Sequence, residues 1–265
     1  MSAPPLIDTH CHLDFEAFDN DRAEVMQRAY ANDISDIIIP GTERIHWDRI
    51  KDLCSADTGE QPPGQPRLHP CYGLHPYWVC EKNRPDIEAL IDYIDINRPI
   101  AVGECGLDFR PRQADKKTQL YFFETQLGIA ADARLPVVIH SVRATETVIQ
   151  LIKKNNSLRG MIHSYSGSLE QARQLIDLNF YISLGGSVSY DNASKIRRVA
   201  KEIPLTSLLL ETDAPDQPDK INQQKRNEPA YLLNTLDVIS GLRKQPAETI
   251  ALQTTSNARA LFDIP

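Results

Sequence analysis

The chain has 265 residues, of which 41% are hydrophobic and 25% are charged. This composition is typical of a globular protein, and the length allows a sizeable core in one large domain or two small ones. A formal net charge of −7 argues against a basic surface for nucleic acid over the whole molecule. It leaves a local site open, because bound cations would neutralise an acidic pocket.

The cysteines and the N-terminal sequence argue against a disulfide-linked, zinc-thiolate, membrane or secreted protein. The five cysteines are scattered and form no CxxC pair, so neither a disulfide framework nor a thiolate zinc site is indicated. No segment is apolar over the length of a membrane-spanning helix, and MSAPPLIDTH has no basic region followed by an apolar stretch. We therefore expect a cytoplasmic protein without membrane contacts, and we take it to be a monomer.

Short apolar or β-branched runs alternate with longer amphipathic stretches along the chain. Eight runs are typical of strands: PLIDTH, DIIIPG, LHPCYGLHP, PIAVGECG, PVVIHS, GMIHS, YISLGG and SLLLETD. Apolar residues at three- and four-residue spacing predict helices between them, for example over 22–31, 118–133 and 144–154. Because the strands are apolar at nearly every position, they predict a parallel sheet covered by helices, an α/β protein.

Periodicity leaves two α/β architectures open, an open doubly wound sheet and a closed TIM (β/α)8 barrel. Unusual polar residues end strands from the whole length of the chain: His10, His12, His75, Glu104, His140, His163 and Asp213. A barrel brings all its strand ends to one mouth, whereas an open sheet would separate the first from the last. We therefore predict a single TIM-barrel domain over residues 1–265, with its site at the C-terminal mouth.

The stretch IDTHCHLD places two histidines one residue apart. Alternate side chains of a strand share a face, so His10 and His12 are predicted to point the same way, together with Asp8. One histidine at a strand end is often only a satisfied polar side chain, but five of the seven occupy such positions. We interpret the other two, His46 and His69, as structural or surface residues.

Two carboxylates join these histidines. Burial of Glu104, in VGECGLD, would cost several kcal/mol without a partner, which is either a divalent cation or Arg110. Asp213, in LLLETDAP with Glu211 on the same face, either binds a cation or caps a helix. Imidazole and carboxylate suit Zn, Mn, Fe or Ni, and Mg less tightly. Six ligand candidates exceed one tetrahedral ion, and they predict two ions bridged by Glu104 and a hydroxide.

Eight motifs together carry a family resemblance: DTHCHLD, YGLHP, GECGLD, PVVIH, HSYSG, ETDAP, RNEP and NARALF. In order over the full chain, they resemble the TatD-type metal-dependent hydrolases of the amidohydrolase superfamily. The resemblance implies a TIM barrel with two divalent ions, of Mg, Mn or Zn, and these ligands: His10, His12, Glu104 and Asp213 for one ion, and Glu104, His140 and His163 for the other. It also implies substrate contacts from His75 and from Arg226 in RNEP.

Three places depart from the family pattern. Arg143 is a candidate for binding substrate, but HSVRA places it one position later than the HSR of the family. HSYSG carries Tyr165 where Phe is common. After ETDAP the chain has DQP in place of an apolar pair, on the stretch 214–229 that we predict to be a substrate loop. By contrast, the Pro- and Gly-rich stretch 57–67 is predicted to be a surface loop without chemistry.

Two cations that share a hydroxide would activate water for hydrolysis of phosphodiesters, esters or amides. With Glu104 as the bridge, Asp213 is the candidate for orienting the water and moving its proton, and His75 and Arg226 are candidates for stabilising phosphoryl charge. Basic residues follow strands four, five and eight and predict a modest phosphate footprint: Arg110, Arg112, Lys116, Lys117, Arg143, Lys220, Lys225 and Arg226. Tyr77 and Trp78 are candidates for stacking on a base.

The activities of the family imply a deoxyribonuclease, and specifically a 3′–5′ exonuclease acting on DNA or RNA ends. Nucleic acid is then the expected partner. Three alternatives stay open: a D-aminoacyl-tRNA deacylase, an amidohydrolase or lactonase acting on a small molecule, and a metal-binding scaffold without catalytic activity.

Overall fold

The computed structural model describes residues 4–55, 64–111 and 114–265. Eight strands run parallel in chain order, each paired with the next along the sequence. Their bounds are β1 (Leu6–Asp8), β2 (Ile34–Pro40), β3 (Arg67–Tyr72), β4 (Ala101–Asp108), β5 (Val137–Val142), β6 (Gly160–Ile162), β7 (Phe180–Leu184) and β8 (Leu208–Leu210). At the ends of β1 and β8, the amide of Thr9 donates to the carbonyl of Leu210, and that of Asp213 to the carbonyl of His10. These bonds join the first and last strands, and the predicted TIM barrel is confirmed.

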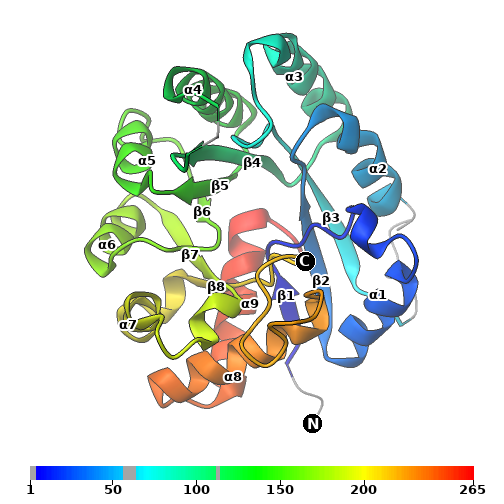
Figure 1. Cartoon of the computed structure of the whole chain (residues 1–265), viewed down its shortest axis with the longest axis vertical. Helices are drawn as coiled ribbons and strands as arrows, with labels where there is room; N and C mark the ends of the chain where they lie inside the picture. Colours follow the sequence, from blue (N-terminus) through cyan, green and yellow to red (C-terminus); the bar gives the residue numbers. More distant parts are fainter. Residues whose placement is uncertain (1–3, 56–63, 112–113) are drawn as a thin grey trace.

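Most of the helices form a ring around the strands, whereas the last one lies behind the middle of the barrel in this view (Figure 1). In chain order they are α1 (Arg22–Ala31), α2 (Arg44–Ser55), α3 (Pro85–Asn97), α4 (Lys116–Ala133), α5 (Thr145–Ile152), α6 (Leu169–Asp177), α7 (Ser194–Glu202), α8 (Leu232–Arg243) and α9 (Ala247–Phe262). Short 3-10 helices lie in the connections: η1 (Glu16–Phe18), η2 (Glu81–Asn83), η3 (Gly186–Ser189), η4 (Leu205–Ser207) and η5 (Pro229–Tyr231). Within the described ranges, no helix combines the length and the hydrophobicity needed to cross a membrane.

The strands are apolar at successive positions because both of their faces are buried. In β2, Ile37 and Ile39 pack toward the surrounding helices, whereas Ile38 belongs to a second cluster inside the barrel. The inner cluster includes Leu261 and Phe262 from the end of α9. The last helix therefore covers the interior of the barrel at the end opposite the strand C-termini, which leaves the C-terminal mouth for a site.

Several boundaries differ from the prediction. The strand β1 ends at Asp8, so His10 and His12 lie in the connection after it, whereas Glu104 lies within β4 rather than beyond it. The helix predicted from residue 118 begins at Lys116, because the Asp115 side chain accepts hydrogen bonds from the first-turn amides and caps it. Most of the predicted loop 57–67 lies outside the described residues, as does Arg112.

Candidate metal centre

The seven polar residues predicted at strand ends gather at the C-terminal mouth. His10 and His12 follow β1, His75 follows β3, and the remaining four come from β4, β5 and the connections after β6 and β8. In the described part of the chain, their ligand atoms form three groups within 4.8 Å: His10, Glu104 and His163; His10, His12 and Asp213; His75, Glu104 and His140. The predicted ligands therefore lie together, with His75 beside them.

One half of the cluster is built on the histidine pair. The Nε2 atoms of His10 and His12 lie 3.3 Å apart, and they lie 3.3 and 3.5 Å from Oε2 of Glu104. The Oδ1 atom of Asp213 is 3.5 Å from the first nitrogen and 3.6 Å from the second. Ligand atoms about 2.1 Å from one cation lie about 3.4 Å apart at tetrahedral angles. The observed spacings therefore fit a divalent cation.

The other half of the cluster surrounds the second oxygen of the same carboxylate. Oε1 of Glu104 lies 2.7 Å from His163 Nε2, 3.0 Å from His140 Nδ1 and 3.3 Å from His75 Nε2. Each oxygen of Glu104 thus faces its own set of imidazoles. Close approach of β4 and β5 makes this possible, because a Cβ atom at Gly106 would lie 2.1 Å from the carbonyl oxygen of His140.

The charges of the cluster balance one another. Although burial opposes ionisation, attraction to His163, His75 and His10 holds the pKa of Glu104 well below its usual range. Burial likewise opposes charge on His163, but Glu104 raises its pKa well above the usual value. Burial raises the pKa of Asp213 to about 6. The negative charge of Glu104 is thus balanced by the proton on His163, and a divalent cation would take the place of that proton.

A second set of carboxylates supports these side chains. Oδ2 of Asp108 lies 3.3 Å from His140 Nε2, and Oε1 of Glu211 lies 3.7 Å from His163 Nδ1. The hydrogen bond to Asp108 fixes the orientation of His140, as is usual for metal-binding histidines, whereas Glu211 is at ion-pair distance from His163 without a hydrogen bond. Our sequence analysis missed Asp108, although its position four residues after Glu104 in the same strand places both side chains on one face.

The acid at position 8 has a structural role. Its oxygens accept hydrogen bonds from the amides of His10 and Thr212, at 3.3 and 2.9 Å, and from the Thr212 hydroxyl at 2.5 Å. Asp8 is absent from the three groups of clustered ligand atoms found in the described residues. It therefore ties the end of β1 to the connection after β8 and brings the histidine pair to Asp213.

The cluster lies at the base of a cavity of about 630 Å³. Tyr77 and Trp78 line it and are half exposed, as expected for groups at a rim. Of the described lining residues, Arg110 is the only arginine or lysine. It binds Asp108 rather than Glu104, so the alternative partner considered for Glu104 is not used.

In the described structure, Asp213 does not cap a helix, which was the alternative role considered for it. No helix begins at Asp213 within the described ranges, and its Oδ2 instead accepts a hydrogen bond from Gln217 Nε2. The amide oxygen of Gln217 in turn accepts a hydrogen bond of 2.7 Å from Ser164 Oγ. The departure DQP therefore supplies a polar contact to the cluster, and Asp216 and Gln217 are the part of 214–229 that lines the cavity.

The two arginines predicted to contact substrate lie elsewhere. Arg143 is exposed and does not line the cavity in the described structure. Both terminal nitrogens of Arg226 bind the Asp21 carboxylate at 2.7 Å. Neighbouring Asn227 is buried and donates to the carbonyls of Thr212 and Asp216 at 2.8 Å. The RNEP segment thus holds the connection after β8 in place, and substrate contact by the two arginines stays a prediction.

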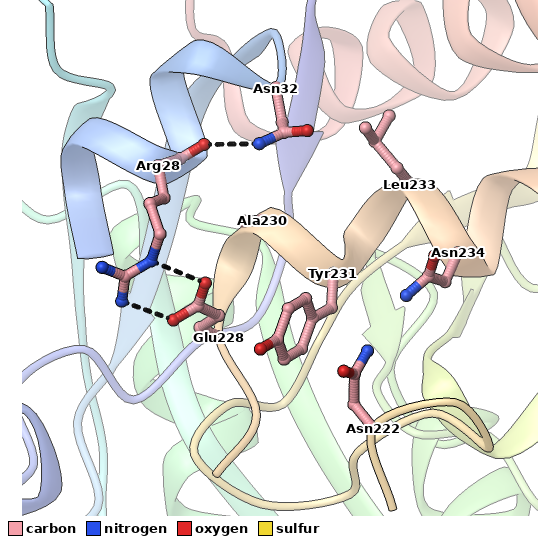
Figure 2. A pocket seen from close by; sticks show the side chains of 8 residues that line it. All are labelled: Arg28, Asn32, Asn222, Glu228, Ala230, Tyr231, Leu233 and Asn234. Atoms are coloured by element: carbon pink, nitrogen blue, oxygen red, sulfur yellow. Dashed lines mark hydrogen bonds and ion pairs between the residues drawn. The ribbon is translucent and has the colours of Figure 1, made fainter. Parts of the chain in front are cut away.

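A second cavity, of about 540 Å³, lies beside the RNEP segment (Figure 2). Its described lining residues differ from those of the cavity above the cluster. Figure 2 shows Glu228 on its wall, paired with Arg28 through hydrogen bonds of 2.9 and 2.7 Å. The carboxamide of Asn222 donates to Asp219 at 2.9 Å. The charged pair on this wall is therefore satisfied within the protein.

A TIM barrel with a buried cluster of histidines and carboxylates at its C-terminal mouth defines a metal-dependent hydrolase. The chain belongs to the family of TatD-related DNases, whose sequence profile matches residues 7–263. It is 36% identical over 263 residues to the uncharacterized metal-dependent hydrolase YjjV of Escherichia coli K12, covering 98% of both chains. It is 34% identical over 261 residues to the uncharacterized metal-dependent hydrolase YabD of Bacillus subtilis 168, covering 98% of this chain and 99% of YabD.

Solved structures give the same result. A crystal structure of YjjV, described as a TatD homolog from Escherichia coli K12, matches with a TM-score of 0.89 at 35% identity, over 98% of both chains. A TatD family hydrolase from Entamoeba histolytica matches with a TM-score of 0.85 over 99% of both chains. At 22% identity, this structural match shows that the two proteins share a fold.

Proposed function

We propose that the protein is a divalent-metal-dependent phosphodiesterase, and specifically a 3′–5′ exonuclease that acts on DNA or RNA ends. The proposal includes two bound cations, of Mg, Mn or Zn, and a monomer that acts in the cytoplasm. The observation that carries it is the position of Glu104, whose two oxygens face separate sets of imidazoles below one cavity. The family description as DNases supports nucleic acid as the substrate.

Six side chains would hold the cations: His10, His12, Glu104 and Asp213 for one, and Glu104, His140 and His163 for the other. Bound there, the cations would polarise the phosphoryl group and increase the acidity of the attacking water. The donor set fits this use, because imidazole and carboxylate ligands without thiolate suit Mn and Zn and also accept Mg.

Asp213 is the residue that would accept the proton of the attacking water. It lines the cavity, and Gln217 holds its second oxygen, which leaves Oδ1 directed at the histidine pair. A carboxylate fixed in this way can act as a general base on a water bound between it and the substrate.

His75 would donate a hydrogen bond to a phosphoryl oxygen. The amide of Tyr77 donates to His75 Nδ1 at 3.0 Å, so this nitrogen is the acceptor and the ring proton is on Nε2. Burial lowers the pKa of His75 to about 4, and the ring is therefore neutral at pH 7. A neutral imidazole with its proton on Nε2 is a donor rather than a metal ligand, which supports a role on the substrate.

The test uses DNA and RNA strands labelled at the 3′ or the 5′ end, single and double, with Mg, Mn or Zn. We expect stepwise shortening from the 3′ end by the wild type. Asp213→Asn should reduce the rate by about 10²- to 10⁴-fold, as loss of a general base does, whereas Asp191→Asn, on the surface outside the cavity, should not. Hydrolysis of a D-aminoacyl-tRNA ester or a lactone, with no cleavage of any strand by any metal, would overturn the proposal.

A further inference from the structure

Arg110 differs from the other basic residues that were predicted around the mouth. It lines the cavity above the cluster, whereas Lys220 and Arg226 do not and are paired with Asp191 and Asp21. A positively charged hydrogen-bond donor beside the reacting group favours an anionic substrate. Among the described residues that line the cavity, Arg110 is the only arginine or lysine.

The guanidinium of Arg110 is fixed on one side by Asp108. Its Nε lies 3.0 and 2.9 Å from the two carboxylate oxygens, and its Nη2 lies 2.5 Å from Oδ2. The backbone amide of Arg110 donates to the same carboxylate at 3.0 Å. The side chain is 46% exposed, and within the described residues Nη1 makes no hydrogen bond or ion pair. An arginine held in this way loses little freedom when its remaining donors bind a ligand.

The same carboxylate connects Arg110 with the metal centre. Oδ2 of Asp108 also lies 3.3 Å from His140 Nε2, and the other ring nitrogen, Nδ1, lies 3.0 Å from Oε1 of Glu104. One continuous set of contacts therefore runs from the bridging carboxylate through His140 and Asp108 to the guanidinium. These contacts hold the guanidinium on the cavity wall next to the cluster, where it can donate a hydrogen bond to an anion.

We propose that Arg110, held by Asp108, binds the phosphate of the substrate through Nη1. Of the eight basic residues in the predicted phosphate footprint, this selects Arg110, whereas Arg143 and Arg226 were the candidates for substrate contact from the sequence. The inference rests on the proposed function, since it deepens the account of the same site. It also makes Arg110 the residue that selects an anionic phosphodiester over an uncharged ester of similar size.

The test compares two small substrates, the anionic bis(p-nitrophenyl) phosphate and the uncharged p-nitrophenyl acetate, on the metal-loaded enzyme. The variants are Arg110→Gln, Arg110→Lys and a control, Arg84→Gln. Arg84 is a matched control because its Nε and Nη2 bind the Glu81 carboxylate in the same paired manner, its side chain is 41% exposed, and it does not line the cavity.

For the phosphodiester, we expect Arg110→Gln to raise KM about tenfold with a smaller change in kcat, as loss of one charged contact does. Arg110→Lys should recover part of this loss, and Arg84→Gln should match the wild type. Hydrolysis of the uncharged ester should be the same in all variants. Circular dichroism and metal content confirm that each variant folds and binds the same ions.

Two results would overturn the inference. One is phosphodiester kinetics in Arg110→Gln equal to those of the wild type. The other is an equal loss of kcat on both substrates, which would mean that Arg110 acts only by supporting Asp108 and His140. A wild type that hydrolyses the uncharged ester but no phosphodiester would instead refute the proposed function, and with it the inference.

Discussion

Replacement of Glu104 by glutamine tests whether one carboxylate serves two cations. Glutamine has the same shape, but it lacks the negative charge, and its amide nitrogen cannot bind a cation. Since Oε1 and Oε2 face different sets of imidazoles, at least one set loses its carboxylate ligand. We therefore expect the metal content to fall from two ions per chain to one or none.

The expected size of the effect follows from linkage. A cation at about 100 times its Kd stabilises a folded protein by about 2.7 kcal/mol per site, so two sites give about 5.4 kcal/mol. With an unfolding entropy of about 2.1 cal/mol/K per residue, a chain of 265 residues should gain about 10 °C in Tm from two ions. Glu104→Gln should gain about 5 °C or less.

Elemental analysis after chelation and reloading gives the metal content, and thermal melts with and without metal give the shift. Glu43→Gln is the matched control, because Glu43 lies outside the cluster, with its side chain 30% exposed and 3.6 Å from His46. The control should keep two ions and the full shift in Tm. Two ions and a full shift in Glu104→Gln itself would refute the idea that this carboxylate is the bridge.

Two further changes test the surroundings of the centre. In Gln217→Asn, the new asparagine tolerates the positive φ of 48° but is too short to reach both Asp213 and Ser164. Loss of a contact of about 1 kcal/mol predicts a kcat about fivefold lower with KM unchanged. Steady-state kinetics with a raised KM and an unchanged kcat would contradict this prediction. Asp36→Asn, within β2, should destabilise the fold by about 2 kcal/mol at pH 7, because the buried Asp36 carboxylate is hydrogen-bonded to Arg67 and His69. Burial raises the pKa of Asp36, but these partners outweigh burial and lower its pKa in the folded protein below 3.8. The stability that ionised Asp36 contributes is therefore present above pH 3.8, and it is lost as the pH falls through the folded pKa. Urea unfolding should therefore show a smaller difference between the two proteins at pH 3 than at pH 7, and an equal difference would refute this account.

The fold could be predicted from the sequence because its strands are buried on both faces. Apolar runs such as DIIIPG have no polar alternation, which is typical of a parallel sheet under helices. Polar residues at strand ends then favoured the barrel over an open sheet. The cluster was predicted for the same reason, since position in the chain relative to a strand end determines which end of a barrel a side chain occupies.

Contacts made by the connections could not be predicted in this way. Arg226 binds Asp21, about 200 residues away in the sequence, and no local pattern indicates that pairing. Arg143 has a φ of 53°, a left-handed backbone conformation that a strand-end motif does not reveal. Asp108, by contrast, could have been found by extending the strand alternation from Glu104 by four residues.

Closure of the barrel and assembly of the metal centre depend on the same few contacts. His10 and His12 follow the first strand and Asp213 follows the last, so they meet only when β1 and β8 are adjacent. Asp8 makes that junction through Thr212, and the Asp213 amide adds a bond to the His10 carbonyl. Cations bound between these residues would therefore stabilise the junction as well as the site, because ligands from both ends of the chain are held only in the folded state. For this reason, metal content and thermal stability should change together in the variants described above.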